Sequence, residues 1–299
     1  MPDPENLVCD AAPAISLGRR ACQEDALAVD FTAGAGFGFA VLSDGMGGHA
    51  AGEIASKVVV TEMFSELKMQ AGNPVDTEKN IGAILRNAAL GANDCLASYT
   101  QRFPETRGMG ATLIAPVIAA NRLYWISVGD SPLFLFRGNR LFRLNEEHSL
   151  GQQLKIRVLE GRLSQEQADL IEDQDCLTSV LMGRNIQHTD CREIPVTLRH
   201  NDIIVAASDG LLYLTEDQIA RILHDNCFRS SAEISEKLMQ AVAAQDDPEQ
   251  DNISLCTIRI TDPSVTGARG PMDTRPKRRL FLNLHENSEP AAGTLRVLR

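Results

Sequence analysis

The amino-acid sequence predicts an α+β protein, in which antiparallel strands occupy the middle of the chain and helices flank them. Three observations support this fold class. Apolar residues recur at intervals of three and four between residues 81 and 99, short strands follow one another through residues 111–143, and capping signals open two helices after residue 214. The middle strands have short connections, which favour antiparallel pairing because parallel strands need a long crossover.

The chain begins with residues 1–13, which contain three prolines and several acids and are expected to be mobile. Regular structure is expected to begin near Ile15. Residues 29–30 and 37–43 are predicted strands, joined by a turn at residues 32–36. The turn is rich in glycine, but it lacks the GxGxxG spacing and leads into a strand, so a nucleotide-binding loop is not favoured.

A long helix is predicted next, with one apolar face formed by Ile81, Ile84, Leu85, Ala88, Ala92, Cys95, Leu96 and Tyr99. This stripe is interpreted as core rather than as a cofactor site. Four strands follow, at residues 112–119, 123–128, 133–137 and 141–144. The turns between them fall at Asn121, Gly129 and Gly138.

Regular elements are fewer in the second half of the chain. Residues 150–190 are polar and mixed, and are expected to be helical with a mobile section. Residues 203–207 form a continuous apolar run that ends at Ser208, which is typical of a buried strand followed by a turn. The remaining predicted elements are helices at residues 215–223 and 230–244, each opened by a Ser or Thr cap, and a strand at residues 253–260.

Composition divides the chain into a globular domain, residues 14–260, and a flexible basic tail, residues 261–299. The whole chain carries a formal net charge of −11, and the tail, with seven Lys or Arg and four Asp or Glu, carries +3, which leaves −14 for the rest. An acidic body excludes nucleic acid as its partner. The basic cluster at residues 275–279 has Phe281 as its only nearby aromatic residue, so a solvated tail is favoured over nucleic-acid binding, and an acidic protein partner for the tail stays open.

The cysteines indicate a reducing compartment. There are seven, an odd number without any CxxC pair, so neither a disulfide framework nor a zinc site is expected. No basic stretch followed by an apolar run begins the chain, and no apolar run is long enough to span a bilayer. We therefore expect a cytoplasmic protein without a membrane partner.

Several acidic residues lie at predicted strand ends or in glycine turns: Glu24, Asp25, Asp44, Asp130, Asp209 and Asp251. A single aspartate in such a turn commonly only satisfies nearby backbone groups. Asp44 and Asp209, however, each end an apolar strand and precede a glycine. If these strands are neighbours, the carboxylates converge and repel each other, and a divalent cation removes that penalty. Hard oxygen ligands select Mg²⁺ or Mn²⁺.

A phosphate group needs a fixed cation as well, and Arg20 lies just before Glu24. The guanidinium group matches phosphate oxygens in a forked geometry. Arg19 is the neighbouring alternative for this contact, although a surface role is favoured for it.

These acidic residues belong to a longer series of short motifs. In chain order they are Gly18-Arg19-Arg20-Ala21-Cys22-Gln23-Glu24-Asp25, Asp44-Gly45-Met46-Gly47-Gly48-His49, Gly110-Ala111-Thr112-Leu113, Gly129-Asp130-Ser131, Asn145-Glu146-Glu147-His148-Ser149, Ser208-Asp209-Gly210-Leu211 and Asp251-Asn252. The series resembles the ordered motifs of the metal-dependent type-2C (PPM) Ser/Thr protein phosphatases, in their bacterial form, over roughly residues 15–260.

The resemblance implies a fold, an αββα sandwich of two antiparallel β-sheets flanked by helices. It also implies two bound Mn²⁺ or Mg²⁺ ions, the first held by Asp44, Asp209 and Asp251. The second would be held by Asp44, the Gly45 carbonyl and Glu24. A third, weaker metal site formed by Asp130 and Asp209 is a further possibility that the resemblance leaves undecided. Arg20 would bind the phosphate group, and Asp25 and Asn252 would lie behind the metal ligands.

The sequence departs from the family pattern at several positions. Gln23 replaces an Asn, Pro132 stands where an Arg is usual, and Glu147 replaces an Asp; Ala111 and Ser254 replace threonines. None of these changes removes a metal ligand. Met46 occupies the place of a His that some relatives use as the acid, which leaves His49 or a metal-bound water as alternatives for that role.

The predicted activity is hydrolysis of phosphoserine and phosphothreonine in proteins by a hydroxide held between the metal ions. A cysteine-based phosphatase is excluded, since no CxxxxxR signature occurs. A relative that binds phosphoproteins without turning them over is the alternative, although the intact Asp44, Asp209 and Asp251 argue against it. The expected partners are phosphorylated proteins and a cognate bacterial Ser/Thr kinase.

Overall fold

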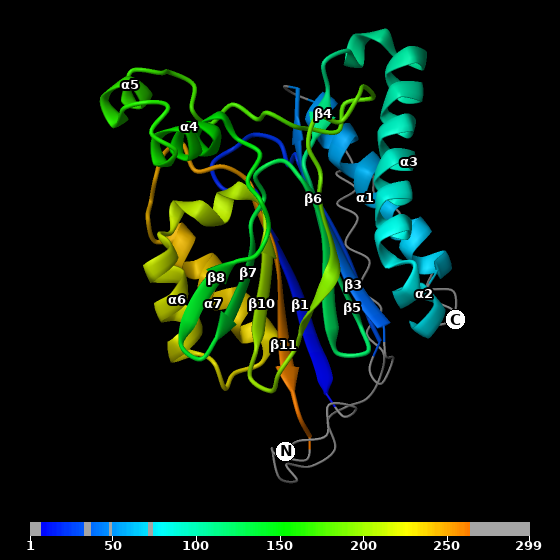
Figure 1. Ribbon diagram of the computed structural model, residues 1–299, viewed down its shortest axis with the longest axis vertical. Coiled ribbons are helices and arrows are strands. Elements are labelled where there is room, and N and C mark those ends of the chain that lie inside the picture. The colour runs from blue at the N-terminus through cyan, green and yellow to red at the C-terminus, as the bar shows by residue number, and fades with distance from the viewer. Residues whose placement is uncertain (1–6, 33–36, 48–49, 71–73, 264–299) are drawn as a thin grey trace, which may run out of the picture.

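Two antiparallel β-sheets packed face to face, with helices on both outer sides, make up the computed structural model in Figure 1. The structure describes residues 7–32, 37–47, 50–70 and 74–263. The first sheet has the strand order β1-β11-β10-β7-β8, and the second has the order β2-β3-β5-β6-β9, with β4 paired to β3. All strand pairs are antiparallel. The predicted αββα sandwich is therefore confirmed.

The strands of the first sheet are β1 (Val8–Ser16), β7 (Leu133–Arg137), β8 (Arg140–Arg143), β10 (Ile203–Ala207) and β11 (Ile253–Thr261). Those of the second sheet are β2 (Asp25–Phe31), β3 (Phe37–Met46), β4 (Gly110–Ala111), β5 (Leu113–Ala119), β6 (Arg122–Val128) and β9 (Asp190–Thr197). The helices are α1 (Ala50–Gln70), α2 (Pro74–Lys79), α3 (Ile81–Arg102), α4 (Leu150–Leu159), α5 (Gln165–Asp169), α6 (Glu216–Asp225) and α7 (Ser231–Ala243), with short 3-10 turns η2 (Pro104–Thr106) and η3 (Asp209–Tyr213).

Three apolar layers hold the sandwich together. Leu42, Ile114 and Ile258 belong to the layer between the two sheets. Phe39 and Val41, on the opposite face of β3, pack with α1 and α3, while α6 and α7 cover the outer face of the first sheet. Because successive side chains of a strand point to opposite faces, strands buried on both faces are continuously apolar, as β3 and β10 are.

The first strand corrects one expectation. Residues 8–13 are not a mobile start but belong to β1, which pairs with β11 along its whole length, from Val8 with Thr261 to Ser16 with Ile253. Pro13 fits there because β1 is an edge strand, where a missing N–H group costs no ladder bond on the open side. Residues 1–6 of the expected mobile segment lie outside the described residues, as do residues 264–299 of the expected tail.

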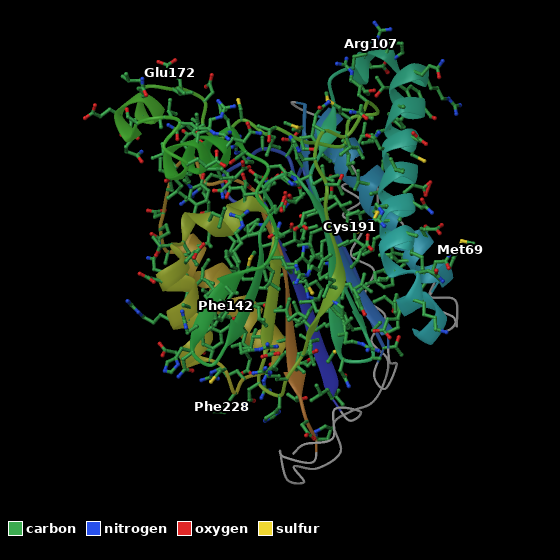
Figure 2. The ribbon with its side chains drawn as sticks, viewed as in Figure 1. Met69, Arg107, Phe142, Glu172, Cys191 and Phe228 are labelled. Atoms are coloured by element: carbon green, nitrogen blue, oxygen red, sulfur yellow. The ribbon has the colours of Figure 1, made fainter. Side chains whose placement is uncertain are left out.

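One end of the sandwich carries the loops that matter for the site. The C-terminal ends of β3, β6 and β10 and the N-terminal ends of β2 and β11 meet there, since the strands are antiparallel. Helices α4 and α5 project beyond this end (Figure 1). In Figure 2, Glu172 after α5 and Arg107 after α3 mark its two sides.

Candidate metal centre

The structure brings the predicted acidic residues together at this end of the sandwich. Asp25 of β2 and Asp44 of β3 are direct partners in the strand ladder of the second sheet. Asp209 begins η3 directly after β10, and Asp251 lies just before β11, the neighbour of β10 in the first sheet. Asp130 lies in the connection between β6 and β7. Both sheets thus contribute carboxylates to one cluster.

The side chains of Asp44 and Asp209 are the centre of this cluster. They come from different sheets, and each lies close enough to the other to influence its pKa. Loss of hydration raises the pKa of Asp44 well above its usual range, and the charges of Asp25, Asp209 and Asp130 raise it further. Burial, followed by the charge of Asp251, raises the pKa of Asp209.

Asp25 lies behind this pair and is only 3% exposed. The hydroxyl of Ser208 donates to Asp25 Oδ2 over 2.7 Å. Burial raises the pKa of Asp25 to about 7, although the hydrogen bond from Ser208 opposes the shift. Asp25 Oδ1 and Asp209 Oδ1 are buried and accept no hydrogen bond among the described residues. Buried carboxylate oxygens without donors are the kind of group that a cation satisfies.

The second predicted set of ligands, Glu24 and the Gly45 carbonyl, converges on Gly52 at the start of α1. A Cβ atom added to Gly52 would lie 2.4 Å from Glu24 Oε1 and 2.8 Å from the Gly45 carbonyl oxygen. Gly45 itself donates its N–H to the Glu24 carbonyl over 3.1 Å. The two oxygens therefore face the same small space, which only a glycine in α1 leaves open.

Arg20 points at the cluster and Arg19 points away from it. The Arg20 guanidinium donates to Asp251 Oδ2 over 2.8 Å, whereas Arg19 pairs with the exposed Asp246. The Asn252 side chain holds the segment between β1 and β2, which carries Arg20 and Glu24. Its Oδ1 accepts the N–H of Glu24 over 2.7 Å, and its Nδ2 donates to the Leu17 and Cys22 carbonyls. Asn252 thus fixes the backbone next to Glu24.

The donor set fits Mn²⁺ or Mg²⁺ in chemistry, because it consists of carboxylate and carbonyl oxygens. No three Asp, Glu, His or Cys side chains among the described residues already stand as a closed metal cage. Asp251 is instead paired with Arg20.

The loop that carries Asp130 is held by residues 143–148. His148 Nδ1 accepts the N–H of Gly129, Arg143 donates to the Asp130 carbonyl over 2.6 Å, and Asn145 donates to the Ser131 carbonyl over 2.9 Å. Arg143 also pairs with Glu147. Burial raises the pKa of Asp130 to about 7, and the charge of Asp209 adds to the shift. Glu147, one of the positions where the sequence departs from the family pattern, therefore takes part in holding this loop through Arg143.

Sequence reasoning gave no role to the neutral residues that hold this cluster, among them Ser208, Asn145 and Thr112, although all three stand in the quoted motifs. Their hydrogen-bond partners lie on other segments of the chain, so their roles become visible only in the folded structure. His49, the candidate acid, lies outside the described residues.

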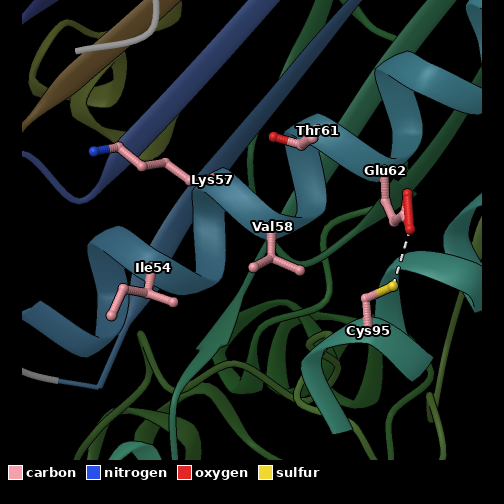
Figure 3. A pocket seen from close by; sticks show the side chains of 6 residues that line it. All are labelled: Ile54, Lys57, Val58, Thr61, Glu62 and Cys95. Carbon is pink, nitrogen blue, oxygen red and sulfur yellow. Dashed lines mark hydrogen bonds between the residues drawn. The ribbon is translucent and has the colours of Figure 1, made fainter. Parts of the chain in front are cut away.

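A surface pocket of about 350 Å³ lies elsewhere, between α1 and α3 (Figure 3). It is lined by Ile54, Lys57, Val58, Thr61, Glu62 and Cys95. The Cys95 thiol donates to Glu62 Oε1 over 3.0 Å, and this hydrogen bond is the main reason that the pKa of Cys95 is raised to about 11. A thiol that stays protonated is a poor nucleophile, so this pocket does not compete with the carboxylate cluster as a reaction site.

Comparison with known proteins finds similarity over most of the chain. The profile of the family described as Protein phosphatase 2C matches residues 16–250. The serine/threonine protein phosphatase PstP of Mycobacterium tuberculosis is 30% identical over 229 residues, which are 76% of this chain and 41% of PstP. The chain therefore spans less than half the length of that relative. The serine/threonine phosphatase stp of Listeria welshimeri is 29% identical over 198 residues, 66% of this chain and 74% of stp.

A solved structure extends the likeness to the fold. The catalytic domain of PstP in complex with two manganese ions superposes with a TM-score of 0.65 at 28% sequence identity. The superposition covers 86% of this chain and 100% of that domain.

Among the helices of the described residues, none combines the length and apolar character that a membrane crossing requires.

Proposed function

The chain belongs to the protein phosphatase 2C family, and from that membership we propose that it hydrolyses phosphoserine and phosphothreonine in proteins with Mn²⁺ or Mg²⁺ as cofactor. The observation that carries this proposal is the convergence of Asp25, Asp44, Asp209 and Asp251 from both sheets, with buried oxygens of Asp25 and Asp209 that accept no hydrogen bond among the described residues. A divalent cation held by these carboxylates would remove their repulsion.

Each acidic residue has a proposed role toward two ions. Asp44, Asp209 and Asp251 hold one ion, and Asp44, Glu24 and the Gly45 carbonyl hold the other. A third, weaker site formed by Asp130 with Asp209 is part of the proposal. When bound, such ions supply Lewis-acid stabilisation and an activated water for attack on phosphorus.

Arg20 binds the phosphate group in this proposal. Its guanidinium group stands beside Asp251 and is 52% exposed, so that a substrate can reach it. When Asp251 turns toward a cation, the guanidinium group is free to pair with phosphate oxygens, which it matches in geometry. Asn252 and Asp25 keep Glu24 and Asp209 in place from behind.

The proposed substrates are phosphorylated proteins, and a bacterial Ser/Thr kinase is the proposed counterpart that supplies them. The names of the mycobacterial and Listeria relatives and the Asp44-Gly45-Met46-Gly47-Gly48-His49 motif support this choice. A cytoplasmic location and a role in signalling are part of the same proposal. All seven cysteines lie in the described part of the chain and none is in a disulfide, as a reducing compartment requires.

Metal-dependent turnover tests the proposal. Hydrolysis of p-nitrophenyl phosphate and of a phosphothreonine peptide should require Mn²⁺ or Mg²⁺, stop in EDTA and return when Mn²⁺ is restored. Full turnover in EDTA would rule out the metal mechanism. The alternative, a binding module without activity, predicts phosphopeptide binding without turnover at any cation concentration.

A further inference from the structure

Thr112 occupies the space between the Asp44 strand end and the Asp130 loop. It falls in the break between β4 and β5 and is 3% exposed. Its hydroxyl and its methyl group face different neighbours, and each neighbour belongs to the carboxylate cluster.

The first set of contacts fixes the backbone of Asp44. The N–H of Thr112 donates to the Asp44 carbonyl over 2.8 Å, and the N–H of Asp44 donates to Thr112 Oγ1 over 3.0 Å. The Ser43 hydroxyl donates to the Thr112 carbonyl over 2.6 Å. Both backbone polar groups of Asp44 therefore depend on one residue of the neighbouring strand segment.

The second set of contacts reaches the Asp130 loop from the other side. Thr112 Oγ1 and Ser131 Oγ are 2.8 Å apart and hydrogen-bonded. The methyl group of Thr112 packs on Gly129, where an added Cβ atom would lie 2.7 Å from Thr112 Cγ2. Gly129 has a φ of 106°, so a glycine there permits both the turn and the close approach. Thr112 thus contacts the residues on both sides of Asp130.

We propose that Thr112 is a positioning residue that holds the Asp44 backbone and the Asp130 loop in a fixed relation, and thereby sets the affinity of the cation sites to which Asp44 and Asp130 contribute. The proposal rests on the metal-dependent function proposed above. Carboxylates that repel each other relax apart unless their backbones are held, and a gap set by a rigid side chain keeps them ready for a cation. Threonine is suited to this place because Oγ1 accepts from Asp44 while it pairs with Ser131, and the methyl group fills the space over Gly129.

The test measures Mn²⁺ affinity by calorimetry, beside the thermal transition of the metal-free protein. Thr112→Val keeps the shape and removes the hydroxyl, and it should weaken Mn²⁺ binding about tenfold or more, in the range found for partners of metal ligands. Thr112→Ser keeps the hydroxyl and should stay within about threefold of wild type. Ser131→Ala keeps the bond to Asp44 but loses the link to the Asp130 loop, and its affinity should fall between those of wild type and Thr112→Val.

A matched control separates this role from the general cost of losing a buried hydroxyl. Thr257 of β11 is fully buried and pairs with the Ser235 hydroxyl over 2.9 Å, as Thr112 pairs with Ser131. Thr257→Val should lower the melting temperature and leave Mn²⁺ affinity unchanged.

Equal Mn²⁺ affinity in Thr112→Val and Thr257→Val, with wild-type binding intact, would overturn the inference and leave the proposed function standing. If Thr112→Val does not fold, wild-type affinity in Ser131→Ala would overturn it instead. A wild-type chain that binds no Mn²⁺ would overturn the proposed function, and the inference with it.

Discussion

The carboxyl groups of Asp44 and Asp209 are the proposed centre of the cation site, and their burial makes them costly to the metal-free protein. Each has lost hydration, and the charge of Asp209 raises the pKa values of Asp44, Asp25 and Asp130. Because like charges at short range oppose folding, neutralising one of them should stabilise the metal-free protein while it removes a ligand.

Asp209→Asn tests whether Asp209 destabilises the metal-free protein while it serves as a metal ligand. The amide oxygen can still accept the Gly210 N–H that Asp209 uses, so the fold should persist. We expect kcat to fall at least 100-fold, about 2.7 kcal/mol, and the metal-free melting temperature at pH 8 to rise. Asp246→Asn, an exposed acid paired with Arg19, is the control and should change neither value. A variant that keeps half of the wild-type kcat would remove Asp209 from the site.

Arg20 pairs with Asp251 of the acidic cluster, whereas Arg19 pairs with the exposed Asp246. Substituting each arginine in turn should therefore show which one binds phosphate. Arg20→Ala removes the cation beside Asp251 and should raise KM for a phosphopeptide as well as lower kcat, since phosphate is bound in both ground and transition states. Arg19→Ala loses only an exposed pair with Asp246, and exposed pairs contribute little. The opposite ranking of the two KM values would assign the phosphate contact to Arg19.

At the scale of elements, the site depends on close approaches between loops from different strands. Gly18, with a φ of 62°, lies where an added Cβ atom would be 2.1 Å from the Asp251 carbonyl oxygen. The segment before β2 therefore packs directly on the segment before β11, and this contact sets where Asp251 and Arg20 stand.

Gly18→Ala should displace the Asp251 backbone, lower the melting temperature and weaken Mn²⁺ binding measured by calorimetry. Gly138→Ala is the matched control, because Gly138 has a similar φ of 57° with no atom within 4 Å of the added Cβ. The control should show only the strain of a left-handed residue, about 1–2 kcal/mol. Equal effects of the two variants on Mn²⁺ affinity would mean that the contact does not position Asp251.

At the scale of the whole molecule, one end of the sandwich gathers acids from both sheets, and protons compete there with cations. Burial raises the pKa of Asp25 and of Asp130 to about 7 from the ordinary 3.8. The metal-free folded state thus binds more protons than the unfolded state between about pH 4 and 7. The stability that these groups contribute is complete below pH 4 and is lost as the pH rises through 7.

We therefore expect the metal-free melting temperature of the wild type to fall, relative to Asp25→Asn, between pH 5.5 and 8. Saturating Mn²⁺ should reduce the pH dependence of the difference in melting temperature between the two proteins, because the cation replaces the protons. Melting curves recorded for both proteins with and without Mn²⁺ provide the check. Parallel pH profiles of the two metal-free proteins would contradict the raised pKa of Asp25.

The end of the folded domain is also a property of the whole molecule. Asp262 is fully buried and donates its N–H to His200 Nδ1 over 2.9 Å, so the ordered chain continues two residues past the predicted boundary at 260. Removal of residues 264–299 should change turnover of p-nitrophenyl phosphate by less than about twofold, 0.5 kcal/mol. Lost turnover would place the tail in the folded domain. A loss confined to protein substrates would support docking of the tail to an acidic partner.

Local patterns in the sequence identified the acidic residues of the candidate site and most of the central strands. Asp44 and Asp209 stand out because each follows an apolar strand and precedes a glycine, and Arg20, Glu24 and Asp251 belong to the same ordered motifs. Strand periodicity is a local property, so the strands between residues 112 and 144 could be predicted from nearby residues alone. Their turns at Asn121, Gly129 and Gly138 have positive φ values, as the residue types indicate.

The contacts that hold the acidic residues in place form only when distant segments of the chain come together in the folded structure. The strand β1 forms because β11, more than 200 positions away, offers it a partner, and the proline-containing segment alone gives no sign of this. Likewise, Thr112 is an ordinary strand residue until Asp44 and the Asp130 loop are brought to it from two other strands. Whether two buried groups form a hydrogen bond depends on the distance between them in the folded protein. A single sequence shows which groups are present but not how far apart they lie.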